Sequence, residues 1–325
     1  MNKIKTISVI LLFFLLSTFI YGCGQKQNEI NQVDKTNDNK LTIFTTLFPI
    51  EDFTKKIGGS HVNVTSIIPP GMNAHTYEPT TKTMIQIAEG DAFIYSSEIM
   101  EPYANKIAEA LKDEKVQMVE ASIGIDMSGH VEEEHAEEQA EEHIEEHDHD
   151  FGDVDPHVWI DPILSITLAE NIKNSLIELK PEAAEEFEAN FNSLKIQLEK
   201  LNGSFEALVK GKETPKILVS HAGYGYWEKR YGIEQISISG LSSTNEPSQQ
   251  QLQEIIDYSK ANNIKYIIFE QNITPKIADI IKNEIKAQAL RIHNLSVLTE
   301  EDIKNNEDYF SLMGKNIETL KKALE

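Results

Sequence analysis

Apolar residues along the chain follow two patterns. Short runs rich in Ile, Val and Phe predict strands, whereas longer stretches in which apolar residues recur every three or four positions predict amphipathic helices. The predicted strands are residues 41–46, 62–68, 92–96, 116–119, 216–220, 236–239, 266–270 and 289–293. The predicted helices are residues 50–57, 83–88, 103–111, 163–179, 181–209, 224–231, 249–260, 276–286 and 309–324. Because strands and helices alternate, the pattern predicts an α/β fold with mostly parallel sheets flanked by helices.

The longest helical stretch lies near the middle of the chain, between two groups of predicted strands. Its apolar stripe consists of Phe187, Phe191, Leu194, Leu198, Leu201, Phe205 and Leu208. Pro181 suits the start of such a helix, and Gly203 weakens it near its end. A long helix at this place predicts a rigid connector between two lobes, and a length of 325 residues suits two domains.

The first 22 residues have a pattern of their own. Lys3 and Lys5 precede an apolar run over residues 7–20, which is shorter than the ~20 residues needed to span a bilayer. The run therefore predicts a secretory signal peptide. It ends at Gly22-Cys23, which resembles a bacterial lipobox and contains the only cysteine of the chain. Lipidation of Cys23 would tether the protein to the outer face of the membrane; the alternative is an ordinary signal peptide with a chance cysteine.

An acidic segment interrupts the pattern between His130 and Asp153. Its 24 residues include 12 acids and five histidines, and no Lys or Arg. Such a composition cannot form an apolar core, so we expect a disordered loop. The histidines are His130, His135, His143, His147 and His149. Imidazoles and carboxylates on a mobile loop favour loose capture of a metal ion; the alternative is a solvated loop with no such role.

Residues 143–147 of this segment formally match the H-x-x-E-H pattern of one metalloprotease class. A run of Glu and His contains such spacings by chance, and the segment has too few apolar residues for a catalytic helix. The chain also lacks the G-x-S-x-G and G-x-x-x-x-G-K-[ST] motifs. We therefore expect a protein that is not an enzyme.

Charge and cysteine content narrow the choice of partners and ligands. The chain has 30 Lys and Arg against 53 Asp and Glu, a formal charge of −23. This balance argues against nucleic acid as a partner, because phosphate contacts need basic side chains. One cysteine excludes a disulfide framework and a Cys-based zinc site. A transition metal would therefore need nitrogen and oxygen ligands.

Four of the ten histidines follow or flank predicted strands and are candidate ligands. His75 follows the strand exit at residues 67–71, and His157 precedes a helix. His221 and His293 each end an apolar strand. Ligands of open α/β sheets bind beyond the carboxyl ends of the strands. These histidines are too far apart in sequence for a zinc finger, so they would converge through tertiary structure, most simply in a cleft between two lobes.

Three motifs around these histidines resemble those of the ZnuA/TroA family (cluster A-I), the solute-binding proteins of bacterial metal ABC transporters. They are PPGMNAHTYEP at 69–79, DPHVWIDP at 155–162 and SHAGYGYW at 220–227. The resemblance covers essentially the whole mature chain. It implies two α/β lobes joined by a rigid helix, with the metal in the cleft between them. It also implies delivery of the metal to a membrane permease that a cytoplasmic ATPase drives.

The resemblance assigns His75, His157 and His221 to the family's first three ligand positions. Manganese-type members place Glu at the third position, and imidazole favours zinc, so His221 indicates Zn²⁺. The fourth position is open: we favour His293, which would give four imidazoles, and the alternatives are water, Glu78 or Glu270. A neutral shell leaves the metal charge uncompensated, so we expect carboxylates just outside it, with Glu78, Asp161 and Glu270 as candidates.

The resulting hypothesis is a high-affinity zinc receptor, anchored on the outer face of the bacterial cytoplasmic membrane through its lipid alone and monomeric. Two alternatives remain: a manganese or iron receptor of the same fold, and a membrane-anchored surface adhesin or zinc hydrolase. The expected division of the chain is a signal peptide (1–22), a flexible tether (23–40), an N-terminal lobe (41–162) with the His- and Glu-rich loop (127–153), helices including the connector (163–212), and a C-terminal lobe (213–325).

Overall fold

The computed structural model describes residues 40–127, 154–242, 244, 247–271 and 276–325. The predicted signal peptide, Cys23 and the five histidines of the acidic segment lie outside these residues. Among the helices of the described ranges, none has the length and apolar character to span a membrane.

The first sheet has four parallel strands in the order β2-β1-β3-β4. The strands are β1 (Leu41–Thr45), β2 (Val62–Ser66), β3 (Ala92–Tyr95) and β4 (Gln117–Glu120). The helices between them are α2 (Phe48–Gly58), α3 (Thr81–Ala88) and α4 (Tyr103–Ala110). The strand order reverses between β1 and β3, which is where α/β sheets open a crevice at their carboxyl ends.

The second sheet repeats this arrangement with the order β6-β5-β7-β8, again all parallel. Its strands are β5 (Lys216–His221), β6 (Glu234–Ser239), β7 (Tyr266–Glu270) and β8 (Gln288–Ile292). Its helices are α7 (Gly225–Tyr231), α8 (Gln249–Ala261) and α9 (Lys276–Glu284). Here the order reverses between β5 and β7, so the residues that end these two strands, His221 and Glu270, lie at the crevice. The predicted fold class is confirmed.

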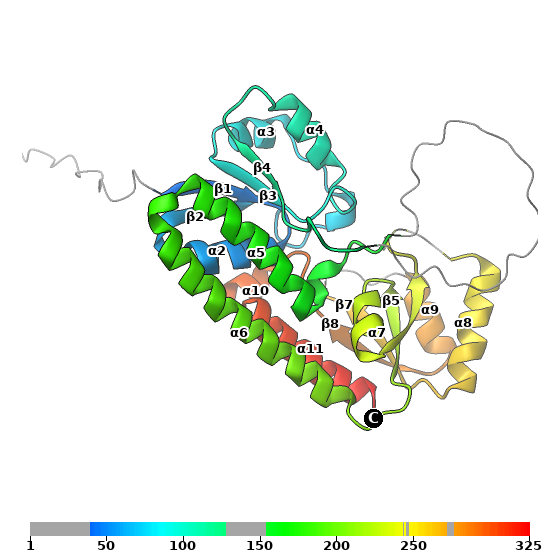
Figure 1. Ribbon diagram of the computed structural model, residues 1–325. Helices are drawn as coiled ribbons and strands as arrows, with labels where there is room; N and C mark the ends of the chain where they lie inside the picture. Colours follow the sequence, from blue (N-terminus) through cyan, green and yellow to red (C-terminus); the bar gives the residue numbers. More distant parts are fainter. Residues whose placement is uncertain (1–39, 128–153, 243, 245–246, 272–275) are drawn as a thin grey trace, which may run out of the picture. The chain divides into compact units, whose positions relative to one another are not determined.

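Two long helices connect the sheets in sequence, α5 (Pro162–Leu179) and the 26-residue α6 (Ala184–Val209). The final helix, α11 (Tyr309–Ala323), packs against α6. Helix α6 packs against α2 and α5 of the first half and against α7 and α11 of the second, and Figure 1 shows α6 beside α5 and α11. Six residues of its predicted stripe are buried, and Leu208 is partly buried. The apolar core is continuous across this region, since one buried cluster includes residues of β1, α5, α6 and β5.

Among the α-helices of the described residues, the sequence pattern missed the short helix α10 (Glu300–Lys304). It has no buried residue, so it leaves no apolar stripe. What defines it is a capping box between Thr299 and Asp302, which satisfies the first backbone N–H groups of the helix. The predicted strand 289–293 also ends one residue earlier, at Ile292, and His293 begins the turn that follows β8.

Candidate metal centre

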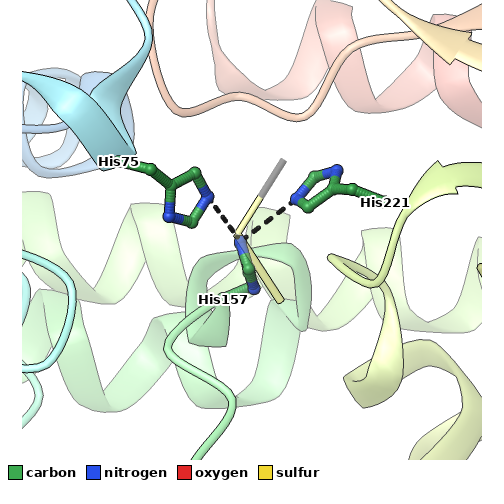
Figure 2. A group of neighbouring side chains, drawn as sticks. All are labelled: His75, His157 and His221. Atoms are coloured by element: carbon green, nitrogen blue, oxygen red, sulfur yellow. Dashed lines mark hydrogen bonds between the residues drawn. The ribbon is translucent and has the colours of Figure 1, made fainter. Parts of the chain in front are cut away.

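Three of the four candidate histidines lie together. The ligand atoms of His75, His157 and His221 are all within 4.8 Å of one another, and Figure 2 shows the three rings facing a common point. The Nε2 atoms of His75 and His157 are 3.2 Å apart, and those of His157 and His221 are 3.4 Å apart. Within the described residues, this is the only such group of His, Cys, Asp or Glu side chains.

His221 is held at the carboxyl end of β5, in the interior of the protein. Its side chain is almost completely buried, and Nδ1 lies 2.6 Å from Glu270 Oε1 at the end of β7. The contact is short, but the ring N–H does not point straight at the oxygen. Gly223 leaves room for this ring, because a Cβ there would lie 2.7 Å from its Cε1 and Nε2 atoms.

His157 is oriented by a neighbour in its own segment. Asp155 Oδ1 accepts hydrogen bonds from the backbone N–H of His157, at 3.0 Å, and from its ring Nδ1, at 2.8 Å. Nδ1 therefore carries the ring proton, and Nε2 is left as a lone-pair donor directed at the other two histidines. The ring also contacts Trp159 edge-on, with centroids 5.3 Å apart.

The segment that carries His157 is fastened to the second half of the chain. Tyr226 donates a hydrogen bond to the carbonyl of Asp155, and Trp227 donates one to the carbonyl of Ile160. Arg230, from the same helix α7, pairs with Asp161. Although His157 comes before the connector in sequence, it is therefore held in place by the same half of the protein as His221.

His75 belongs to a short loop after β2 and is the most exposed of the three. It lies in a 3₁₀ turn (Ala74–Thr76) whose start is capped by the side chain of Asn73. Burial, followed by the proximity of His157 and His221, lowers the pKa of His75 to about 2. The ring is therefore neutral at physiological pH and binds a metal without first losing a proton.

The spacing of these nitrogens suits a small tetrahedral cation. At a Zn–N distance of ~2.0–2.1 Å, tetrahedral geometry places two ligand nitrogens about 3.3 Å apart. The Nε2 separations of His75 and His157, 3.2 Å, and of His157 and His221, 3.4 Å, bracket this value. The two buried carboxylates, Asp155 and Glu270, oppose the charge of a bound dication from the far side of the rings.

Glu270 remains ionised despite its burial. Burial alone would raise the pKa of its carboxyl group. The adjacent His221 and the hydroxyl of Tyr224, which donates to Oε1 at 3.0 Å, outweigh this and lower the pKa below its ordinary value. The site therefore keeps a buried negative charge behind His221.

The structure differs from the expectation for His293, which does not join the three other histidines. Its Nδ1 accepts a hydrogen bond from the backbone N–H of Leu295, and its Nε2 lies 3.2 Å from Asp302. Both ring nitrogens are thus engaged inside the turn after β8. A strand end and a nearby motif are the only signals that the sequence offers for this residue, and they do not specify where the ring points.

The three carboxylates that were predicted to lie just outside the ligand shell occupy three different environments. Glu270 contacts His221 as described, whereas Glu78 is exposed. Asp161 caps the start of α5 through the N–H groups of Ile163 and Leu164 and pairs with Arg230. Burial raises the pKa of Asp161, and Arg230 opposes that effect. Asp155 was not among the predicted carboxylates, although its position two residues before His157 allows the turn in which one carboxylate binds both nitrogens.

Comparison with known proteins agrees with this geometry. The family described as "ZnuA: Zinc-uptake complex component A periplasmic" matches residues 43–323. The chain belongs to the ZnuA family.

Individual relatives support the assignment. The zinc-binding lipoprotein AdcA of Streptococcus pneumoniae (strain ATCC BAA-255 / R6) is 34% identical over 327 residues, which cover 99% of this chain and 61% of AdcA. This chain thus spans less than two thirds of that relative. The high-affinity zinc uptake system protein ZnuA of Bacillus subtilis (strain 168) is 33% identical over 315 residues, which cover 96% of this chain and 97% of that protein.

A solved structure also matches the fold. The Zn(II)-bound ZnuA-like domain of Streptococcus pneumoniae AdcA superimposes with a TM-score of 0.72 at 33% identity. The match covers 88% of this chain and 99% of that domain. ZnuA-family proteins are solute-binding components of zinc-uptake complexes.

Proposed function

We propose that this ZnuA-family protein is a high-affinity zinc receptor that captures Zn²⁺ outside the cell and delivers it to an ABC permease. The observation that carries the proposal is the group of three imidazoles whose ligand atoms lie within 4.8 Å of one another, with His157 Nε2 at 3.2 and 3.4 Å from the Nε2 atoms of His75 and His221. Its relatives are named as zinc-binding or zinc-uptake proteins, and a zinc-bound domain shares its fold.

The ligands in this proposal are His75, His157 and His221, and water completes the tetrahedron. Neutral imidazole favours zinc over manganese, which prefers oxygen ligands. Asp155 accepts a hydrogen bond from Nδ1 of His157, and Glu270 lies 2.6 Å from Nδ1 of His221, so both carboxylates favour the tautomer that presents Nε2 to the metal. The arrangement offers three imidazole nitrogens to a cation.

The remaining parts of the proposal rest on sequence. Lipidation of Cys23 holds the monomeric receptor on the outer face of the cytoplasmic membrane, and residues 23–40 act as its tether. A permease with a cytoplasmic ATPase is the partner that receives the metal. The five histidines of the acidic segment hold further zinc ions weakly and raise the local zinc concentration near the receptor.

The experiment is a zinc titration of the chain without residues 1–22, against a competing chelator. We expect about one tightly bound zinc ion per chain. His75→Ala, His157→Ala and His221→Ala should each lower the affinity more than about tenfold, because loss of a ligand costs at least as much as loss of a residue that hydrogen-bonds to a ligand. His61→Ala is the matched control, because His61 pairs with Glu186 outside the site. Removal of residues 130–149 is expected to abolish only the weak binding.

X-ray absorption spectroscopy at the zinc edge then identifies the atoms that coordinate the zinc ion. Three imidazoles and one oxygen are expected, whereas four imidazoles would restore the four-histidine proposal with His293. Absence of tight zinc, or preference for manganese in direct competition, would overturn the proposed function.

A further inference from the structure

Asn294 lies in the turn that follows β8. It forms hydrogen bonds with two residues that contact the buried histidines, Glu270 and Trp159. Its Nδ2 donates a hydrogen bond to Glu270 Oε2 at 2.8 Å, and Glu270 Oε1 faces His221. Its backbone carbonyl accepts a hydrogen bond from Trp159 Nε1 at 2.8 Å, and Trp159 packs against His157. Among the described residues, the hydrogen bonds of Asn294 include none to the three histidines, so its influence on the site is indirect.

The orientation of the Asn294 side chain is determined by its other contacts. Its Oδ1 accepts hydrogen bonds from Gln271 Nε2 at 2.9 Å, and from the backbone N–H and hydroxyl of Ser296 at 3.0 and 2.8 Å. Because a backbone N–H can only donate, this atom must be the oxygen. The amide nitrogen therefore faces Glu270 and supplies its donor.

The turn itself is held from two helices. Asn316 of α11 accepts a hydrogen bond from the backbone N–H of His293 at 2.8 Å and donates one to its carbonyl at 2.7 Å. The His293 ring accepts the N–H of Leu295 and reaches Asp302 of α10. Leu295 has a φ of 61°, a conformation that costs free energy for a branched residue and persists only where neighbours enforce it.

Glu270 depends on these contacts for its position. It is fully buried, and its two oxygens receive donors from opposite sides, Tyr224 on Oε1 and Asn294 on Oε2. Without the Asn294 amide, Oε2 loses that donor, and a buried carboxylate with an unsatisfied oxygen turns to find another. Such a turn moves Oε1 away from His221 Nδ1, which is already imperfectly aligned.

We propose that Asn294 is a positioning residue of the zinc site, which holds Glu270 so that His221 keeps its proton on Nδ1 and presents Nε2 to the metal. This inference rests on the proposed zinc-receptor function. It also gives the turn after β8 a role, although His293 lies outside the histidine group.

The test uses Asn294→Ser in the chain without residues 1–22. Serine keeps an acceptor for the N–H of Ser296, because Ser and Asn form similar local turns, but it is too short to reach Glu270. Asn294→Ala is the second variant. Asn171→Ala is the matched control, since Asn171 donates two hydrogen bonds to backbone carbonyls after β4 and none to the site.

Two measurements are made on each protein: the zinc dissociation constant by chelator competition, and the tautomer of His221 in the metal-free protein by ¹⁵N NMR of the ring nitrogens. We expect zinc binding to be about tenfold weaker in both Asn294 variants, which is the lower end of the effect of replacing residues just outside the ligand shell. We also expect His221 to change from one tautomer, protonated at Nδ1, to a mixture. The Asn171 control is expected to alter neither quantity.

Wild-type zinc affinity together with an unchanged His221 tautomer in Asn294→Ser would overturn the inference. So would an equal loss of affinity in the Asn171 control, because that would indicate a general effect of destabilisation. If the wild-type protein itself failed to bind zinc, the proposed function would fall instead.

Discussion

Two buried carboxylates, Glu270 and Glu101, lie at similar positions in the two sheets, but their pKa values are shifted in opposite directions. Glu270 ends β7 at the reversal point of the second sheet and has His221 beside it. Glu101 lies at the reversal point of the first sheet, where its oxygens accept hydrogen bonds from the Thr46 hydroxyl and from the N–H groups of Ser96 and Ser97. These donors are neutral, and burial raises the pKa of Glu101 to about 7, whereas the pKa of Glu270 is lowered.

The raised pKa of Glu101 predicts a pH dependence of stability. In the unfolded chain the carboxyl group titrates near its ordinary value of 4.5, so between that value and about 7 the folded state binds more protons than the unfolded state. The free energy of unfolding therefore falls as pH rises through this window, by up to about 3 kcal/mol, and levels off above it. Denaturant titrations at a series of pH values measure this fall.

Glu101→Gln is the control for this prediction. The substitution removes the titrating carboxyl group, whatever its effect on absolute stability. The fall in the free energy of unfolding between pH 4.5 and about 7 should therefore be smaller in the variant by the contribution of Glu101. Parallel curves for the variant and the wild type would show that other carboxyl groups cause the dependence.

At the scale of elements, the turn between β5 and α7 decides how closely the ligands can approach. The strand ends at His221, the helix begins at Gly225, and Gly223 lies between them with no side chain. The space that a Cβ would take is filled by the ring of His221, and the ring of His157 is 3.6 Å away. Glycine is needed here for close packing rather than for an unusual backbone conformation.

Gly223→Ala is expected to displace the His221 ring and to weaken zinc binding by at least about tenfold while the protein still folds. Gly314→Ala, in α11, is the matched control because a Cβ there meets nothing within 4 Å. Replacement of glycine within a helix is expected to stabilise the protein by about 0.5–1 kcal/mol and to leave zinc binding unchanged. Equal zinc affinities of both variants would contradict the packing argument.

At the scale of the whole molecule, the three histidines bring together segments that are distant in sequence. His157 and His221 are tied to each other by contacts from α7 and from the turn after β8. The loop of His75 has fewer such ties, one of which is the hydrogen bond from the N–H of Gly71 to the carbonyl of Leu298. A bound cation therefore adds a link between the loop after β2 and the other two ligands.

This link predicts zinc-dependent stability. Free zinc at about 100 times its dissociation constant should add about 2.7 kcal/mol to the free energy of unfolding. For a chain of this size that corresponds to an increase in Tm of about 4–5 °C, which a chelator should reverse. At the same zinc concentration, His75→Ala should reduce the increase by at least about half with little change in the metal-free Tm, whereas His61→Ala should retain it. A zinc-induced increase of undiminished size in His75→Ala would place the stabilising ion elsewhere.

The sequence alone determined the elements and the three histidines that converge. Strands, helices and the long connector are visible because local apolar periodicity reports which face of a segment is buried, and α6 buries the stripe that the pattern predicts. His75, His157 and His221 are recognisable because each lies in a compact motif next to a strand or helix end.

Only the tertiary structure decided how these residues are partnered. His293 ends a predicted strand as His221 does, but its ring is turned into a local network with Leu295 and Asp302. Asp155 proved to be a partner of His157, while Asp161 proved to be a helix cap. The physical reason is that a strand end specifies where a Cα lies, whereas the direction of a side chain depends on donors and acceptors supplied by segments far away in the sequence.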